Sequence, residues 1–117
     1  MAVHALQAEI RAANQPTELD NLYAAWRFAK AQWDSALYSP ENRGNDLCDE
    51  VNERHCDATC DALNAFLLHP ADPPGDLSRK LRVFRDEQIA EGWTKAPLIV
   101  EQLVKDASHI ASEWRRK

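Results

Sequence analysis

The segment HPADPPG at residues 69–75 is the feature that most constrains the fold. Its three prolines lack backbone donors and disfavour helix in the residues before them, so the chain must break and reverse here. On either side, apolar residues recur every three or four positions, the period of an α-helix, and the chain has only three glycines. No segment alternates as a strand does. These patterns predict an all-α fold, a four- to five-helix bundle that is mostly antiparallel.

A single helical domain is expected to cover residues 1–117, because a chain of this length normally forms one hydrophobic core. The breaks between helices are marked by prolines and glycines, which end a helix or cap the next one. Helices are therefore predicted over about 3–13, 18–38, 45–68, 77–91 and from about 94 onward.

The second predicted helix has the clearest boundary. Thr17 is expected to cap it, with Asp20 three residues later completing a capping box. We expect the second, third and last helices to form the main bundle, because they carry the widest apolar stripes. The predicted core consists of the large residues of those stripes and of the fourth helix, namely Trp26, Trp33, Phe66, Leu81, Phe84, Leu103, Ile110 and Trp114.

The helix predicted over 18–38 has a second side that carries no charge. A surface helix would normally be charged on the side that faces away from the core. Either this helix is central in the bundle, or its second side packs on a partner. We predict a homodimer, in which this side faces a second copy of the chain. The predicted interface residues are Ala24, Ala25, Phe28 and Ala31.

The stretch CDEVNERHCDATCD at residues 48–61 places three cysteines and a histidine among acidic residues. On a helix, at about 100° per residue, these residues separate onto two faces. Cys48 and His55 fall on the apolar stripe, and Cys56 and Cys60 lie at its border. The acidic face is interpreted as solvated, or alternatively as a surface that binds a basic protein or imitates nucleic-acid phosphates. Its residues are Glu50, Glu53, Asp57 and Asp61.

The cysteines are interpreted first as small apolar residues that pack. Structural zinc needs four ligands. Cys56 and Cys60 could supply two, and the second pair would have to come from Cys48 with a distant His4, His69 or His109. A reactive thiol needs basic neighbours, whereas these neighbours are acidic. We therefore expect no metal and no cofactor. A metal- or thiol-dependent protein that uses Cys56 and Cys60 is kept as an alternative.

The helix predicted over 77–91 contains a basic cluster. Such clusters can contact phosphates. These side chains spread around the helix, however, and no aromatic platform or glycine-rich loop accompanies them. Nucleic acid is therefore not expected as a partner, and the cluster is predicted to pair with the acidic helix within or between subunits. The cluster comprises Arg79, Lys80, Arg82 and Arg85.

No motif of a known catalytic site occurs in the chain. A phosphate-binding loop, a serine-centred elbow and a paired-carboxylate motif are all missing. The protein is therefore predicted not to be an enzyme. The beginning of the sequence lacks the features of a signal peptide, and no stretch approaches a membrane span. The expected compartment is the cytoplasm, where the three cysteines would be free thiols.

The stretch HPADPPGDLSRKLRVF, followed by EGWTKAPLIVEQLVKDASHI, resembles small helical proteins of unknown function from alphaproteobacterial genomes and prophages. In those proteins a proline-containing turn precedes a Leu-x-x-Lys-Leu helix, a Gly-Trp junction and a closing helix. The resemblance lies within residues 69–110 and does not extend to the first half of the chain. It implies a helical accessory protein and no activity. The matching positions are Pro70, Leu77, Lys80, Leu81, Gly92, Trp93, Leu103, Asp106 and Ile110.

Together these features predict a non-enzymatic interaction or regulatory protein, an accessory protein of a bacterium or prophage that acts through protein–protein contacts as a homodimer. A basic protein is a further candidate partner. The alternative from a different class is a phage-linked protein that binds or imitates nucleic acid.

Overall fold

The computed structural model describes residues 15–38, 49–71 and 73–116. Within them the chain is helical and contains no strand, which confirms the all-α prediction. The helix predicted over 3–13, as well as Cys48 and His4, lies outside the described residues. The elements are α2 (Glu18–Leu37), α3 (Asp49–Leu68), α4 (Pro74–Asp86), the short 3-10 helix η1 (Ile89–Glu91) and α5 (Ala96–Arg115).

The start of α2 is the predicted capping box. The backbone N–H of Asp20 donates to the Thr17 hydroxyl at 3.1 Å, and the backbone N–H of Thr17 donates to the Asp20 carboxylate at 2.9 Å. These bonds satisfy two donors that a helix start would otherwise leave without partners. They fix where α2 begins.

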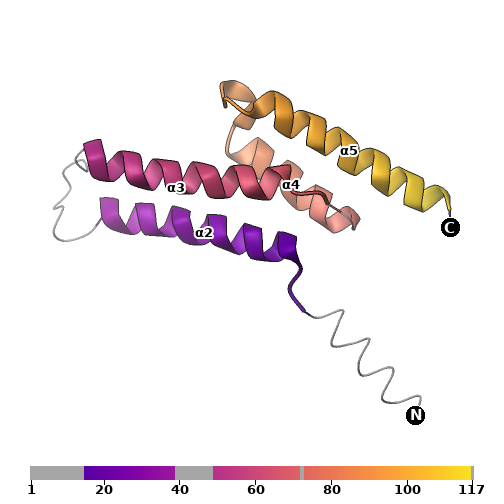
Figure 1. Cartoon of the computed structure of the whole chain (residues 1–117), viewed down its shortest axis with the longest axis horizontal. Helices are drawn as coiled ribbons and strands as arrows, with labels where there is room; N and C mark the ends of the chain where they lie inside the picture. The colour runs from indigo at the N-terminus through magenta and orange to yellow at the C-terminus, as the bar shows by residue number, and fades with distance from the viewer. Residues whose placement is uncertain (1–14, 39–48, 72, 117) are drawn as a thin grey trace, which may run out of the picture.

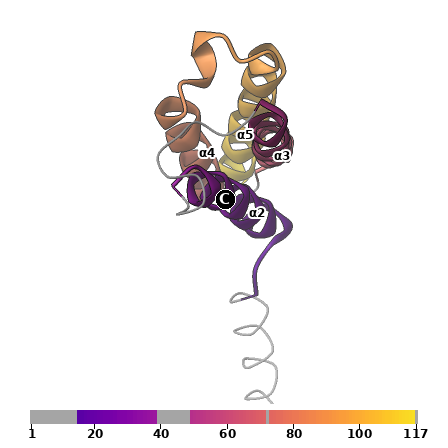
Figure 2. The same cartoon turned by 90° about the vertical axis from the view of Figure 1, so that its left-hand side faces the viewer.

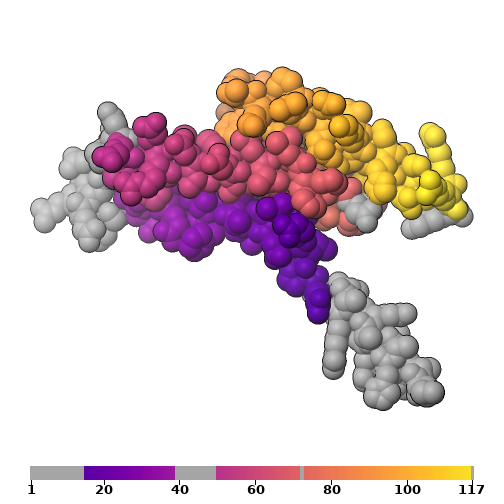
Figure 3. Space-filling model, viewed as in Figure 1, coloured from indigo at the N-terminus to yellow at the C-terminus, as the bar shows by residue number. Residues whose placement is uncertain are grey.

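The helices α2 and α3 form an antiparallel pair along most of their length (Figure 1). The chain then reverses at the proline-rich segment, as predicted, and α4 returns behind the pair. After η1 it reverses again, and α5 runs beside α4 and α3 (Figure 2). The C-terminal turns of α5 extend beyond the end of α3 (Figure 3). The four longer helices thus alternate in direction along the chain.

The core lies where all four longer helices meet. Phe66 and Leu67 of α3 are completely buried, as is Ile99 of α5. The Phe66 ring stacks parallel to Trp26 with ring centroids 6.5 Å apart. The remaining buried apolar residues are Leu19, Leu63, Ala71, Val83, Ile89 and Leu103.

Two predicted core residues lie on the surface instead. Leu81 is 47% exposed and Trp114 is 77% exposed. On α4 the inward positions are taken by Lys80 and Val83, so Leu81 points away from the bundle. Trp114 lies on a side of α5 that no other described element covers. Trp26, Phe66 and Leu103 are buried as predicted, whereas Trp33, Phe84 and Ile110 are half-buried.

The expected main bundle also needs correction, because α4 belongs to it. Its Lys80 and Val83 are buried, and Arg79 joins it to α2. The helix ends at Asp86 rather than near residue 91. The chain there turns through Gln88 and Gly92, which have φ angles of 55° and 118°. Gly92 fits this left-handed geometry without a side-chain clash, so the predicted stop at Gly92 ends η1 instead of α4.

Candidate functional site

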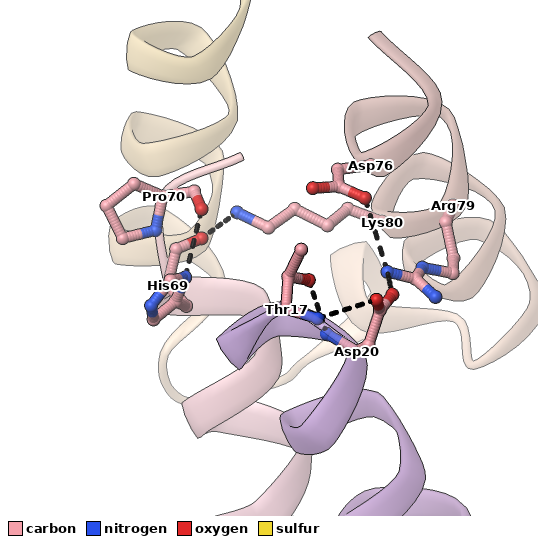
Figure 4. Close-up of polar contacts among 7 residues, drawn as sticks. All are labelled: Thr17, Asp20, His69, Pro70, Asp76, Arg79 and Lys80. Atoms are coloured by element: carbon pink, nitrogen blue, oxygen red, sulfur yellow. Dashed lines mark hydrogen bonds and ion pairs between the residues drawn. The ribbon is translucent and has the colours of Figure 1, made fainter. Parts of the chain in front are cut away.

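A polar junction ties the start of α2 to α4 (Figure 4). The Arg79 guanidinium donates to Asp20 at 2.8 Å and to Asp76 at 3.3 Å. It also lies over the Tyr23 ring, 4.8 Å from the centroid, and 5.9 Å from that of Phe66. The hydrogen bond from the Thr17 backbone, followed by the Arg79 guanidinium, lowers the pKa of the Asp20 carboxyl below its ordinary value. These contacts hold the start of α2 against α4.

Lys80 forms a second and fully buried junction. Its ammonium donates to an Asp106 carboxylate oxygen of α5 at 2.6 Å and to the backbone carbonyl of His69 (Figure 4 shows Lys80 and His69). The other Asp106 oxygen accepts from the Ala71 backbone N–H and from the Gln102 amide, both at 2.9 Å. Since every described contact of this pair is internal, we interpret it as a structural lock that joins α4, α5 and the turn after α3.

The predicted basic cluster is therefore not a surface patch. Lys80 is inside the protein, and Arg79 is already bound to carboxylates. Arg85 pairs with its neighbour Asp86 at the surface, and Arg82 is exposed. Among the described residues, the arginine ion pairs of α4 are made to Asp20, Asp76 and Asp86. In the part of the chain that the structure describes, no ion pair joins α4 to the acidic face of α3, contrary to the pairing expected within the chain.

The acidic face of α3 lies where the helical spacing placed it. Glu50, Glu53, Asp57 and Asp61 are all exposed, and they lie on the side of α3 that faces away from α2. The described residues make no ion pair to them. The face is thus open to a partner, but exposure by itself also fits a solvated helix surface.

The Cys56 and Cys60 thiols line a pocket between α2 and α3. Their Sγ atoms are 3.8 Å apart, so one thiol can donate a hydrogen bond to the other, and they form no disulfide. The pocket has a volume of about 440 Å³ and is lined mainly by apolar and aromatic side chains, including Trp33, Leu63 and Trp93. The predicted histidine neighbours are not part of this lining: His69 and His109 lie elsewhere in the fold, and His4 is outside the described residues.

Two polar groups of this pocket differ in how they are satisfied. The Asn52 amide oxygen accepts from the Trp33 indole N–H at 3.0 Å. The Thr59 hydroxyl is buried and has no hydrogen-bond partner. A buried hydroxyl without a partner costs free energy, so the pocket offers an unused donor and acceptor to a bound molecule. Sequence reasoning missed Thr59, because a threonine on an apolar helix face normally bonds to its own backbone.

The acidity of the Cys60 thiol follows from its surroundings. Burial raises the pKa of the Cys60 thiol to about 11, and Cys56, Asp57 and Asp61 add to this effect. The thiol is therefore protonated at neutral pH, in line with the expectation that acidic neighbours oppose a reactive thiolate. Within the part of the chain that the structure describes, no group of three or more His, Cys, Asp or Glu could hold a metal ion.

Two helix faces expose apolar residues. On α2 the predicted interface residues Ala24, Ala25, Phe28 and Ala31 are all exposed, with Phe28 at 67%. The helix is thus not central in the bundle. On α5 a longer stripe is exposed, of which only Trp114 was predicted to lie in the core. We call it the α5 stripe, and it consists of Val100, Val104, Ala107, Ala111 and Trp114.

A signal for the α5 stripe was present in the sequence. From Ile99 to Trp114 the apolar residues of α5 span an arc of about 140°, whereas a helix that packs on one side needs only about 100°. The structure divides these residues into two sets. Ile99 and Leu103 face the bundle beside Asp106, and the α5 stripe lies about 90° away around the helix.

None of the described helices is both long enough and apolar enough to cross a membrane. Comparison of the chain with protein families, with curated proteins and with solved structures finds no match.

Proposed function

We propose that the chain is a non-enzymatic interaction protein that pairs with a second copy of itself. The observation that supports this most directly is the α5 stripe, whose members are separated by four, three, four and three residues. This is the spacing of the a and d positions of a coiled coil. The stripe stays within an arc of about 80° on the helix, so it can meet one partner helix along its full length.

The charges beside the α5 stripe favour antiparallel pairing. Glu101 and Arg115 lie on the same flank near its two ends, and both are exposed. A twofold axis near Ala107 would place Glu101 of one copy beside Arg115 of the other. It would also set Trp114 against Val100, so that a large side chain meets a smaller one. In a parallel pair the two glutamates would face no opposite charge.

The size of the stripe predicts a modest affinity. It covers two heptads, about 21 Å of helix, which is less than most stable interfaces use. The pairing should therefore depend on protein concentration. This property suits a regulatory or accessory protein of a bacterium or prophage, the class that the C-terminal half resembles. The free Cys56 and Cys60 thiols fit the cytoplasm, a reducing compartment.

The first experiment is a measurement of solution mass by sedimentation over a range of concentrations. The wild-type protein is expected to approach twice the chain mass of 13.3 kDa. Val104→Asp should remain a monomer, because it places a charge in the centre of the stripe. Phe28→Asp is the matched control, because Phe28 is about as exposed on α2 as Val104 is on α5. The Phe28→Asp protein should still dimerise.

The outcomes separate the two faces. If Phe28→Asp alone abolishes the dimer, the interface is the α2 face predicted from the sequence, and the α5 stripe is not used. If the wild-type protein is monomeric at every concentration, self-pairing is wrong. Charge reversal tests the orientation: Glu101→Arg or Arg115→Glu should weaken the dimer, and the two together should restore it.

A second candidate is binding of a basic protein at the acidic face of α3. It rests on the four exposed carboxylates, which have no ion-pair partner among the described residues. Such binding would be driven by charge and would weaken as salt is raised. The variant Glu53→Lys with Asp57→Lys should abolish capture of a polylysine peptide at low salt. Equal capture by the wild type and this variant would dismiss the candidate.

A further inference from the structure

The Cys56 and Cys60 pocket combines three features that packing alone does not require. Two thiols lie 3.8 Å apart on one helix face. Aromatic side chains of Trp33 and Trp93 line the space beside them. The buried Thr59 hydroxyl that borders the same space has no partner. Two thiols beside a mainly apolar wall, with an unpaired hydroxyl nearby, form a site that could hold a molecule which bonds to both sulfur atoms.

The geometry favours a ligand atom that bridges both sulfurs at a bent angle. Two bonds of about 2.3 Å, the usual Zn–S length, would meet at an angle of about 110° across the observed separation. A disulfide instead needs sulfurs about 2.05 Å apart. A linear S–metal–S unit would need them farther apart than they are. The bridging atom should therefore be tetrahedral or pyramidal.

The number of protein ligands beside the two thiols distinguishes a tetrahedral bridging atom from a pyramidal one. A tetrahedral zinc site needs four ligands, and no third His, Cys, Asp or Glu joins the two thiols among the described residues. Zinc would also require the Cys60 thiol to lose its proton, which burial and the carboxylates of Asp57 and Asp61 oppose by raising its pKa. A pyramidal atom needs only two sulfur ligands from the protein, because its third substituent belongs to the ligand itself. Such a ligand therefore requires neither further protein ligands nor deprotonated thiols.

We propose that Cys56 and Cys60 form a capture site for a trivalent arsenic compound that carries one apolar organic substituent. The reaction is a condensation with a dihydroxy arsenical. Two S–H and two As–O bonds break, two As–S bonds form, and both thiol protons leave with the departing oxygens as two waters. No electron is transferred and no net proton is released, so the reaction can start from protonated thiols. The substituent lies against Trp33 and Trp93.

The site is independent of the proposed dimer, because it lies between α2 and α3 and not on the α5 stripe. The two hypotheses can therefore fail separately. Cys48 is removed from the experiment by Cys48→Ser, so that only the two pocket thiols can react. The probe is phenylarsine oxide, which hydrates to the dihydroxy form, and the readouts are native mass spectrometry and quenching of tryptophan fluorescence.

The Cys48→Ser protein is expected to bind one probe molecule with loss of water and to melt at a higher temperature, since the folded pocket, which also holds the phenyl group, binds the probe more tightly than the unfolded chain does. Removing one pocket thiol, with Cys56→Ser or Cys60→Ser, should weaken binding at least roughly 100-fold, because the second sulfur reacts within the same molecule. Binding that persists in either single variant, or that requires Cys48, would overturn the proposal.

A transplanted pair tests the role of the pocket. Glu53→Cys with Asp57→Cys, combined with Cys56→Ser and Cys60→Ser, places two thiols at the same spacing on the exposed face of α3. Inorganic arsenite, which has no organic substituent, should bind both pairs similarly. The phenyl compound should bind the native pair at least several-fold more tightly. Equal binding of the phenyl compound to the two pairs would show that the pocket takes no part, and zinc that displaces the probe would also contradict the proposal.

Discussion

The two ends of the α2 and α3 pair differ in what covers them. At the inner end, where α2 begins and α3 ends, α4 and α5 complete the core around Phe66 (Figure 1). At the outer end, comprising residues 27–38 and 50–58, no described side chain is buried. The stripe of α3 is also weaker at the outer end, where Val51 and Ala58 stand in place of large side chains such as Phe66, whereas α2 keeps Trp33 and Leu37. The comparison therefore shows that α2 carries large apolar side chains beyond the part that α4 and α5 cover, which leaves a pocket and an open face.

The thiol pocket lies where the covered part gives way to the uncovered part. Its lining extends from Leu63 and Trp93, near the core, to Leu37 and Asn52 at the outer end. A groove of this kind forms because α2 and α3 continue beyond the elements that would fill it. Its position explains how Cys60 can be partly buried while the pocket remains open.

Truncation of a large side chain at each end should show the largest difference. Phe66→Ala is expected to lower the free energy of unfolding by about 3–5 kcal/mol, because it leaves a cavity in a fully packed region. Trp33→Ala at the outer end should cost only about 1–2 kcal/mol, since its ring is only half-buried. Urea unfolding followed by circular dichroism measures both. Equal losses would mean that the outer end is as well packed as the core.

A comparison of two lysines tests the inner lock. Lys80→Met should cost about 3–5 kcal/mol, because it leaves the buried Asp106 carboxylate without its cation. Lys30→Met removes the surface ion pair with Glu87 and should cost less than about 1 kcal/mol. Adding Asp106→Asn to Lys80→Met should recover stability, since the amide oxygen can still accept from Ala71. A larger loss in the double variant would contradict this view of the lock.

The smallest expected effect is a dependence of stability on pH at the start of α2. The pKa of Asp20 is lowered in the folded chain, so its carboxylate stabilises the fold above the ordinary carboxyl pKa. This contribution is lost as the pH falls through the lowered folded value. The wild type should thus be more stable than Asp20→Asn at neutral pH, and the difference should vanish in acid. A difference that stays constant in thermal melts across this range would refute the linkage.

The local features of the helices could be predicted from the sequence. The capping box at Thr17, the reversal at HPADPPG and the separate acidic face of α3 depend on short-range spacing and on backbone chemistry. The same reasoning placed Cys56 and Cys60 at the edge of an apolar stripe, where the structure has them. These features require only that a helix forms, because its period then determines which residues share a face.

Features that depend on contacts between helices could not be predicted. Lys80 and Asp106 are 26 positions apart in sequence, and each alone resembles an ordinary surface charge. Only the crossing of α4 and α5 makes them a buried pair. Leu81 and Trp114 show the opposite case, since they were predicted to be buried and are exposed. An apolar residue on a helix is buried only if another element packs against it.

The sequence by itself thus determined that this protein is helical, where its helices break and which side chains share each face, since these follow from the geometry of a single helix. The tertiary structure decided which faces are covered. It buried Lys80, exposed the α5 stripe and opened the pocket beside the two thiols, because burial depends on distances between segments that the pattern of one helix does not contain.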